Sequence, residues 1–351
     1  MDETVLTTRQ KYILNVINQS EGLLREEIQE KVSKLYPVSK PTIIRDLHVL
    51  LIKKLLSVTG KARATIYFPK VSNKLLREFN LERYFADDPD NRTGARKSFD
   101  FEIFKNLHDL LTPEEINILD KVALSFEEKT TKLSPDLLKR ELERFVIELS
   151  WKSSKIEGNT YTLLETESLI KEQKEATGKS KDEAVMILNH KAAFEEILKA
   201  KNDFKTISVS VINQLHNILT KGLGISSGIR KQAVGITGTT YHPLDNEHQT
   251  KEVFEQTINV VNRSKSPFEK TLIVHFMIPY IQPYADGNKR TARMLTNAIL
   301  LAYDLYPLSY RSVDEDEFKK ALILFYEQES IYEIKKLFIE QFKFANETYF
   351  R

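Results

Sequence analysis

Residues 282–293 read Gln-Pro-Tyr-Ala-Asp-Gly-Asn-Lys-Arg-Thr-Ala-Arg, and this stretch decides how the surrounding chain folds. A helix is predicted before it, with Ser266 as N-cap, Pro267 at the first helical position and Glu269 at the third. An Asp-Gly-Asn turn follows at 286–288, and apolar residues then recur at helical spacing. The sequence therefore predicts a tight loop between two helices.

This loop has the composition of a phosphate-binding site. The second helix begins right after the turn, so its free backbone N–H groups and the positive end of its dipole face the loop. Gly287 lets the chain close around an anion, and three cations follow it, Lys289, Arg290 and Arg293. Asp286 is the one carboxylate of the loop able to hold Mg²⁺ beside bound phosphates. A solvated basic helix start behind an ordinary Asp-Gly turn is the alternative.

The loop resembles the signature motif of the Fic (Fido) family, nucleotide-dependent enzymes that modify proteins. The family pattern is His-Pro-Phe, any residue, Asp or Glu, Gly-Asn-Gly or Gly-Asn-Lys, Arg, two residues, Arg. The matching positions here are Pro283, Tyr284, Asp286, Gly287, Asn288, Arg290 and Arg293. The resemblance implies a Mg²⁺ ion on Asp286 and ATP phosphates on the residues that follow it, Gly287, Asn288, Lys289, Arg290 and Arg293.

Two positions depart from the family pattern. Gln282 stands where the family has its catalytic histidine, which takes the proton of a target hydroxyl as that hydroxyl attacks the nucleotide. A glutamine amide has no accessible pKa and cannot act as this base. Lys289 replaces the glycine of the AMP-transferring members and resembles the Doc branch, which transfers a phosphate. His275 lies seven residues before Gln282, and we expect it to be a packed structural histidine.

A second segment that resembles the family lies about 130 residues earlier in the chain. An amphipathic helix is predicted over about residues 134–158, and its tail begins at Ser153 and ends with Glu157 and Gly158. This tail resembles the inhibitory motif of Fic proteins, Ser or Thr, three residues, Glu, then Gly or Asn. The resemblance implies that Glu157 pairs with Arg293 and keeps the γ-phosphate of the nucleotide from docking productively. An exposed glutamate before a C-capping glycine is the alternative.

Between these two motifs, glycines punctuate short β-prone pieces over residues 228–243 and predict a hairpin. In Fic proteins a hairpin flap at this place pairs with an extended piece of the target protein, by β-strand addition. The resemblance implies a target-docking role for Thr240, Tyr241 and His242. A plain structural hairpin is the alternative.

The first 70 residues follow a different pattern. Apolar residues at helical spacing predict three helices, over about residues 9–18, 25–35 and 40–51. Two β-prone pieces around a glycine predict a hairpin, at residues 56–58 and 64–68. Three helices followed by a hairpin make a winged helix-turn-helix domain.

The third of these helices resembles the recognition helix of bacterial DeoR-like regulators. Such a helix presents Lys40, Thr42 and Arg45 to the major groove, and the wing brings Lys61 and Arg63 near phosphates. Residues 1–70 hold 12 Lys and Arg against 7 Asp and Glu, a net charge of +5, whereas the whole chain carries +2. The basic excess therefore lies where DNA would bind. A winged helix used for protein contact or dimerisation is the alternative.

Composition narrows the class of protein. A chain of 351 residues is long enough for two or more domains with separate cores. The absence of cysteine excludes disulfides and thiolate metal sites. No apolar run reaches the length of a membrane span, and the acidic start lacks a signal-peptide pattern. We therefore expect a cytoplasmic protein without membrane contact.

The expected architecture is mainly helical. It consists of an α+β winged helix-turn-helix domain (1–70), a connector (71–114) and an all-helical Fic domain with a small β-hairpin flap (115–351). The leading hypothesis is AMP transfer from ATP, with Mg²⁺, to a hydroxyl of a protein target, restrained by Glu157. The alternatives are an inactive Fic domain that senses nucleotide and regulates transcription at DNA, a Doc-like phosphotransferase, and an interaction adaptor. Fic proteins often self-associate, which suggests a homodimer.

Overall fold

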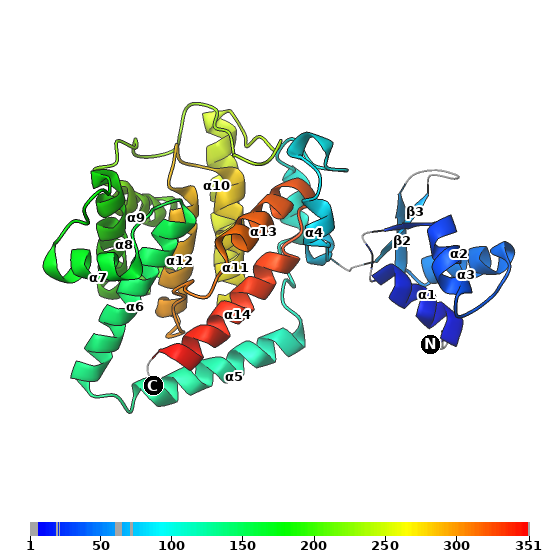
Figure 1. Cartoon of the computed structure of the whole chain (residues 1–351), viewed down its shortest axis with the longest axis horizontal. Helices are drawn as coiled ribbons and strands as arrows, with labels where there is room; N and C mark the ends of the chain where they lie inside the picture. The colour runs from blue at the N-terminus through cyan, green and yellow to red at the C-terminus, as the bar shows by residue number, and fades with distance from the viewer. Residues whose placement is uncertain (1–5, 19, 21, 60–64, 71–72, 350–351) are drawn as a thin grey trace. The chain divides into compact units, whose positions relative to one another are not determined.

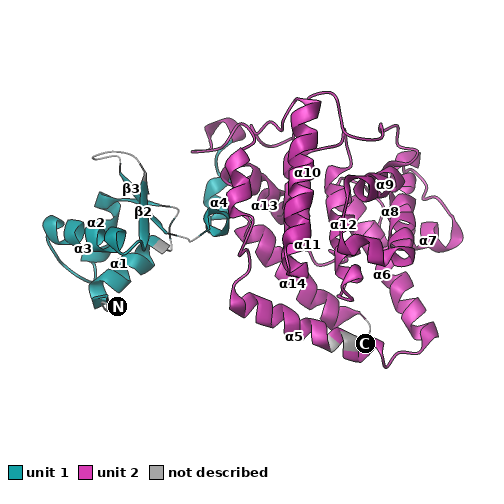
Figure 2. Ribbon diagram, turned by 180° about the vertical axis from the view of Figure 1, so that it is seen from behind, with its two compact units in different colours: residues 1–88 teal, residues 89–351 magenta. Residues whose placement is uncertain are grey.

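The computed structural model describes residues 6–18, 20, 22–59, 65–70 and 73–349, and Figure 1 shows the course of the chain. Its contacts divide the chain into two compact units, Met1–Asp88 and Pro89–Arg351 (Figure 2). Helices dominate, and the described strands form one three-stranded antiparallel sheet. The predicted mainly helical fold class is thereby confirmed. The second unit begins at Pro89, inside the stretch predicted as a connector.

The first unit has the predicted order of a winged helix. Its three main helices are α1 (Thr8–Asn18), α2 (Arg25–Ser33) and α3 (Lys40–Ile52). Its strands are β1 (Leu23–Leu24), β2 (Leu56–Thr59) and β3 (Ile66–Pro69). The strand β3 lies between the other two and is antiparallel to both, with Tyr67 opposite Leu23 on one side and Val58 on the other.

An ion pair with a buried carboxylate joins two helices of this unit. The core itself consists of aliphatic side chains at helical spacing, among them Ile13, Ile28, Ile43 and Leu47. Arg9 Nε on α1 lies 2.6 Å from Asp46 Oδ2 on α3, and Gln10 Nε2 donates to Asp46 Oδ1 at 3.1 Å. Asp46 is buried, so loss of Arg9 would leave a buried carboxylate without its countercharge. The orientation of α3 is thus fixed by both apolar packing and charge.

The second unit is a helical assembly around two central helices, α11 and α12. Its helices are α5 (Pro113–Thr130), α6 (Pro135–Ile156), α7 (Leu163–Glu172), α8 (Lys181–Lys199), α9 (Val209–Thr220), α10 (Glu247–Arg263), α11 (Pro267–Ile281), α12 (Asn288–Ala302), α13 (Glu315–Gln328) and α14 (Tyr332–Thr348). A short helix, α4 (Leu81–Tyr84), belongs to the first unit. In space, α12 contacts α6, α8 and α9, whereas α11 contacts α10, α13 and α14 (Figure 1).

Local sequence signals set the ends of the helices that carry the loop. Ser266 caps α11 by accepting a hydrogen bond from the Glu269 backbone N–H at 3.4 Å, as predicted. All side chains of α11 from Lys270 onward are buried, because neighbouring helices cover this part of the helix on every side. The helix ends at Gln282, which adopts the left-handed conformation with φ +51°. This reversal turns the chain into the loop.

The predicted hairpin flap is not present in the described residues 228–243. That segment consists of turns and bends, with a single parallel bridge between Ser98 and His242. Its backbone groups are bonded elsewhere: Arg230 N donates to Pro283 O at 2.9 Å, and His242 N donates to Lys97 O at 3.0 Å. Tertiary partners therefore replace the strand pairing that the glycine spacing suggested.

Two absences concern the described residues alone. Within them, no helix has both the length and the apolarity needed to span a membrane. The same residues contain no group of three or more His, Asp or Glu side chains arranged to hold a metal ion.

Candidate functional site

The loop at 282–293 is closed by the side chain of Asn288. Its Oδ1 accepts a hydrogen bond from Tyr284 N at 2.9 Å, and its Nδ2 donates to Tyr284 O at 2.8 Å. The same Nδ2 lies 2.7 Å from Gln282 Oε1. Asn288 is buried, so these bonds form in a site shielded from water and hold the loop in one conformation.

Gly287 occupies a position that excludes a side chain. Its φ of +80° is left-handed, and a Cβ atom there would lie 2.9 Å from Thr220 Cγ2. It is also the N-cap of α12, so the first N–H groups of that helix open into the loop. This is the anion-binding arrangement that the sequence predicts.

His216 of α9 packs against the loop, and the sequence did not predict a role for this residue in the site. Its Nε2 donates to the Asp286 carbonyl at 2.9 Å, and its ring stacks on Tyr284 with centroids 3.8 Å apart. Burial lowers the pKa of His216, which favours the neutral ring in this place. In the sequence this histidine falls on the apolar face of a helix, where nothing distinguishes it from a core residue.

Gln282 has both ends of its side-chain amide engaged. Its Nε2 donates to Pro279 O at 2.8 Å, and its Oε1 accepts from Asn288. Its backbone carbonyl accepts from Arg230 Nε at 2.6 Å. The half-buried amide is thus well placed and fixed, and it offers hydrogen bonds but no proton-accepting pKa.

Asp286 and Arg290 form an ion pair across one helical turn. Arg290 Nη2 lies 3.2 Å from Asp286 Oδ2, and Arg290 is buried whereas 71% of the Asp286 side chain is exposed. Burial lowers the pKa of Arg290, and the carboxylates of Asp286 and Glu157 act against that shift. Asp286 is thus an exposed carboxylate of the loop, and carboxylates are among the ligands that Mg²⁺ takes in proteins.

Arg293 is the most enclosed cation of the site. Only 1% of its side chain is exposed, and its Nη1 lies 2.8 Å from Glu157 Oε1 at the end of α6. Its Nε donates to Ser153 Oγ at 2.9 Å and its Nη2 to Ser153 O at 2.8 Å. The structure therefore brings Ser153, Glu157 and Arg293 together.

Glu157 lies between two cations. Its Oε2 is 3.7 Å from Lys289 Nζ, opposite the contact with Arg293. Burial alone would raise the pKa of Glu157, but Arg293 and Lys289 outweigh burial and lower it. Gly158 follows with φ +96° and ends the helix, so the carboxylate is held at the mouth of the anion-binding loop.

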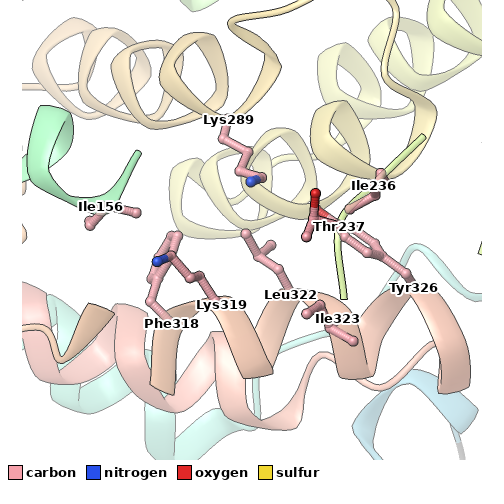
Figure 3. A pocket seen from close by; sticks show the side chains of 9 residues that line it. All are labelled: Ile156, Ile236, Thr237, Lys289, Phe318, Lys319, Leu322, Ile323 and Tyr326. Atoms are coloured by element: carbon pink, nitrogen blue, oxygen red, sulfur yellow. The ribbon is translucent and has the colours of Figure 1, made fainter. Parts of the chain in front are cut away.

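A cavity of about 230 Å³ opens beside Lys289 (Figure 3). Its lining is largely apolar and comes from α6, the 228–243 segment, α12 and α13: Ile156, Ile236, Thr237, Lys289, Phe318, Lys319, Leu322, Ile323 and Tyr326. The Lys289 side chain extends from α12 into this space. An apolar cavity next to a phosphate-binding loop suits a flat ring attached to phosphates.

The structure corrects one of the residues expected to dock a target. Tyr241 is fully buried; its hydroxyl donates to Tyr280 O at 2.9 Å and its ring stacks on Tyr280. It therefore cannot touch a target protein, and that prediction was wrong. Thr240 is half-buried and His242 is exposed. His275, on α11, is buried as predicted, and burial lowers its pKa to about 3.

The candidate DNA-contacting residues are placed only in part. Lys40 and Arg45 are exposed on α3. Thr42 is half-buried, with its hydroxyl 3.1 Å from that of Ser39. The predicted wing residues Lys61 and Arg63 lie outside the described residues.

Two family models match the chain, one in each unit. The Fic/DOC family matches residues 206–300, which include the loop, and the penicillinase repressor family matches residues 6–92. The first of these matches spans α9, α10, α11 and most of α12 in the helical unit. The chain thus contains a segment similar to the Fic/DOC family in its helical unit and a segment similar to the penicillinase repressor family over its winged helix.

Curated relatives match about half of the chain. A "Protein adenylyltransferase Fic" of Nematostella vectensis is 28% identical over 198 residues, which cover 53% of this chain and 44% of the relative. Its namesake in Aedes aegypti is 32% identical over 174 residues, covering 47% and 34%. This chain therefore spans less than half the length of these relatives.

Solved structures share the fold at lower identity. A Fic-domain-containing signalling protein of Bacteroides thetaiotaomicron has a TM-score of 0.56 and 20% identity, covering 66% of this chain and 96% of that one. Residues 134–508 of Fic-1 from C. elegans give a TM-score of 0.58 and 19% identity, covering 67% and 71%. These similarities concern the fold alone.

Proposed function

We propose that this protein transfers AMP from ATP to a hydroxyl group of a protein target, and that Glu157 restrains the reaction. The observation that carries the proposal is the Glu157 carboxylate, held 2.8 Å from Arg293 in an anion-binding loop. There the carboxylate pairs with the Arg293 guanidinium, which a nucleotide phosphate would otherwise bind. Removing it frees the site.

The geometry supports a nucleoside triphosphate as the substrate. The N–H groups at the start of α12 and the side chains of Lys289, Arg290 and Arg293 bind the phosphates. The apolar cavity beside Lys289 takes the base. Lys289 belongs to both the phosphate-binding residues and the lining of the cavity, and its side chain extends from the loop to the cavity.

The reaction requires one bond to form and one to break. The target hydroxyl oxygen bonds to the α-phosphorus, the bond from that phosphorus to the leaving pyrophosphate breaks, and the hydroxyl proton leaves. Asp286 would hold a Mg²⁺ ion, and that ion would neutralise charge on the phosphates. Gln282 orients the hydroxyl by hydrogen bonding, and a phosphate oxygen of the substrate accepts its proton. Such chemistry depends mostly on positioning and charge.

The glutamine sets an expectation for the rate. Loss of a general base typically costs about 10²- to 10⁴-fold. The wild-type protein is therefore a slow enzyme for two separate reasons, the missing base and the restraint by Glu157.

Labelled ATP tests the proposal and its nearest competitor together. The wild type and Glu157→Gly are incubated with Mg²⁺ and ATP labelled at the α- or the γ-phosphate, and label on protein is measured. Label from the α-phosphate in Glu157→Gly supports AMP transfer; label from the γ-phosphate alone shows the Doc-like phosphate transfer instead. No label from either position, with binding of ATP verified by calorimetry, refutes both. Glu157→Gly/Arg293→Ala is the matched control and should carry no label.

A second function rests on the first unit. The winged helix exposes Lys40 and Arg45 on α3, its sequence matches the penicillinase repressor family, and residues 1–70 carry +5. We propose, as the alternative, a regulator that binds DNA and responds to nucleotide through the Fic domain. ATP shifts DNA affinity only if it binds the DNA-bound and free forms differently. Equal affinity for a selected DNA site with and without saturating ATP excludes this coupling.

A further inference from the structure

A buried histidine lies behind the Glu157–Arg293 pair. His190 of α8 is completely buried, with its Nδ1 2.8 Å from Met186 O and its Nε2 2.9 Å from Ser153 Oγ. The two nitrogens thus contact groups of different kinds, a backbone carbonyl and a hydroxyl. The sequence offered no sign of this, because the three segments involved are brought together only by folding.

These partners fix which nitrogen carries the proton. A carbonyl only accepts hydrogen bonds, so Nδ1 is protonated and donates to Met186. In the neutral ring Nε2 is then an acceptor, and the Ser153 hydroxyl donates to it. The hydroxyl lone pairs consequently face Arg293, whose Nε donates to Ser153 Oγ at 2.9 Å.

The surroundings keep the ring neutral. The charged groups that face His190 are Arg290, Arg293 and Glu157, and the Ser154 hydroxyl lies 3.4 Å from Nδ1. Burial is the main cause that lowers the pKa of His190 to about 3, and the two arginines add to it. The direction of the hydrogen bonds is therefore the same throughout the neutral pH range.

We propose that His190 is a positioning residue, which orients the Ser153 hydroxyl and through it holds Arg293 in the position that receives Glu157. Three bonds in series join the four residues, from Nε2 of His190 to Oε1 of Glu157, with lengths of 2.9, 2.9 and 2.8 Å. The restraint on the site then depends on a residue that touches neither the carboxylate nor the nucleotide.

The contacts of His190 are more specific than the packing of a core histidine requires. A core histidine needs one buried partner for each nitrogen, and any buried donor would satisfy Nε2. Here the donor is the one hydroxyl that also contacts Arg293, while the Ser153 carbonyl accepts from the same guanidinium. Ser153 is therefore held from one side by His190 and itself holds Arg293 from the other.

The consequence for nucleotide binding rests on the proposed function. A γ-phosphate competes with Glu157 for Arg293, so a less well oriented Arg293 weakens the restraint. The loss of one buried hydrogen bond is worth about a two- to tenfold change in an equilibrium. Affinity for ATP should rise by that factor when the acceptor on residue 190 is removed, and affinity for ADP, which lacks the γ-phosphate, should not.

A first measurement tests the proposal without any nucleotide. The hydrogen-exchange rate of the Arg293 Nε–H is followed by NMR in the full chain, with the signal assigned by its loss in Arg293→Lys. His190→Leu should exchange at least several-fold faster than wild type, whereas His190→Gln, which keeps an acceptor near the Nε2 position, should stay close to wild type. Equal exchange in folded wild type and His190→Leu overturns the proposal. If His190→Leu does not fold, Ser153→Ala takes its place, and unchanged exchange in that variant overturns the proposal equally.

A second measurement connects the proposal to the site. ATP and ADP are titrated with Mg²⁺ into wild type, His190→Leu, His190→Gln, Glu157→Gly and Glu157→Gly/His190→Leu. His190→Leu should raise affinity for ATP but not for ADP, and should add nothing once Glu157 is gone. An equal gain in the Glu157→Gly background contradicts a role through the ion pair. If Glu157→Gly itself fails to bind ATP, the proposed function fails, and the exchange experiment still decides the role of His190.

Discussion

Glu157 Oε1 lies 2.8 Å from Arg293 Nη1, although 136 residues separate the two in the chain. The contact places a carboxylate at the N-terminal part of α12, where three cations and free N–H groups favour an anion. The protein thus supplies its own anion to its own anion-binding site.

The charge of Glu157 should stabilise the fold at neutral pH. Its pKa in the folded state is below the ordinary value of 4.5, so the stabilisation is fully present above that value and is lost as pH falls through the folded-state pKa. Urea unfolding of wild type and Glu157→Gln should differ by about 1 to 3 kcal/mol at pH 7, because the change leaves Arg293 without a full countercharge. The difference should shrink in acid. A difference that grows as pH falls contradicts this assignment.

Restoring a base should restore rate. In the Glu157→Gly background, Gln282→His should speed transfer from ATP by about 10²- to 10⁴-fold, the usual contribution of a general base. The reason is that an imidazole, whose ordinary pKa lies near neutrality, is a better acceptor for the hydroxyl proton than the phosphate oxygen that takes it in the wild type. Gln282→Ala is the control for position alone and should be slower than glutamine. No gain with histidine would contradict the expectation that the missing base slows the wild-type protein.

Gly287 should resist any side chain. Gly287→Ala forces an alanine into a left-handed conformation, at a cost of about 1 to 2 kcal/mol, and also meets Thr220 Cγ2. Stability by urea unfolding and ATP affinity by calorimetry should both fall. Thr220→Ser removes the methyl group that the new Cβ would meet. The double variant should therefore recover the loss of stability due to this contact and keep the loss due to the left-handed conformation. Full recovery would show that conformation costs nothing here.

The exposed cations of α3 should govern any DNA binding. Arg45→Ala should weaken binding to a selected DNA site by about 1 to 3 kcal/mol if it reads a base, or lower the salt dependence by about one charge if it contacts phosphate. The matched control is Lys199→Ala, which removes an exposed cation of α8 in the second unit. Fluorescence anisotropy over a salt series distinguishes these outcomes, and an unchanged affinity in Arg45→Ala removes α3 from the interface.

Local patterns predicted the parts of the structure that local chemistry determines. The cap at Ser266, the start of the helix near residue 134 and the turn at Gly287 depend on residues a few positions apart, and they appear where expected. The winged helix likewise follows from apolar spacing and β-prone pieces along one short stretch. Each of these features is decided before distant segments meet.

The failures concern contacts between distant segments. The glycines over 228–243 predicted a hairpin, but the backbone there bonds to Lys97 and Pro283 instead of to itself. Tyr241 is covered by Tyr280 and Tyr326, which no spacing near it reveals. The supporting histidines, His190 and His216, look like core residues until the loop and the α6 tail are placed beside them. The resemblance to a known family predicted the pairing of Glu157 with Arg293. The residues that hold this pair in place became visible only in the structure.

Calorimetric titration of ATP with Mg²⁺ into wild type, Glu157→Gly and Glu157→Gly/Arg293→Ala tests most directly whether Glu157 occupies the place of a nucleotide phosphate. We predict that Glu157→Gly binds ATP at least about tenfold more tightly than wild type, a difference of about 1.4 kcal/mol. The added Arg293→Ala change should abolish that gain, since the freed guanidinium is what the γ-phosphate binds. Equal ATP affinity in wild type and Glu157→Gly would contradict the account, because it would show that the Glu157 carboxylate does not compete with the nucleotide for Arg293.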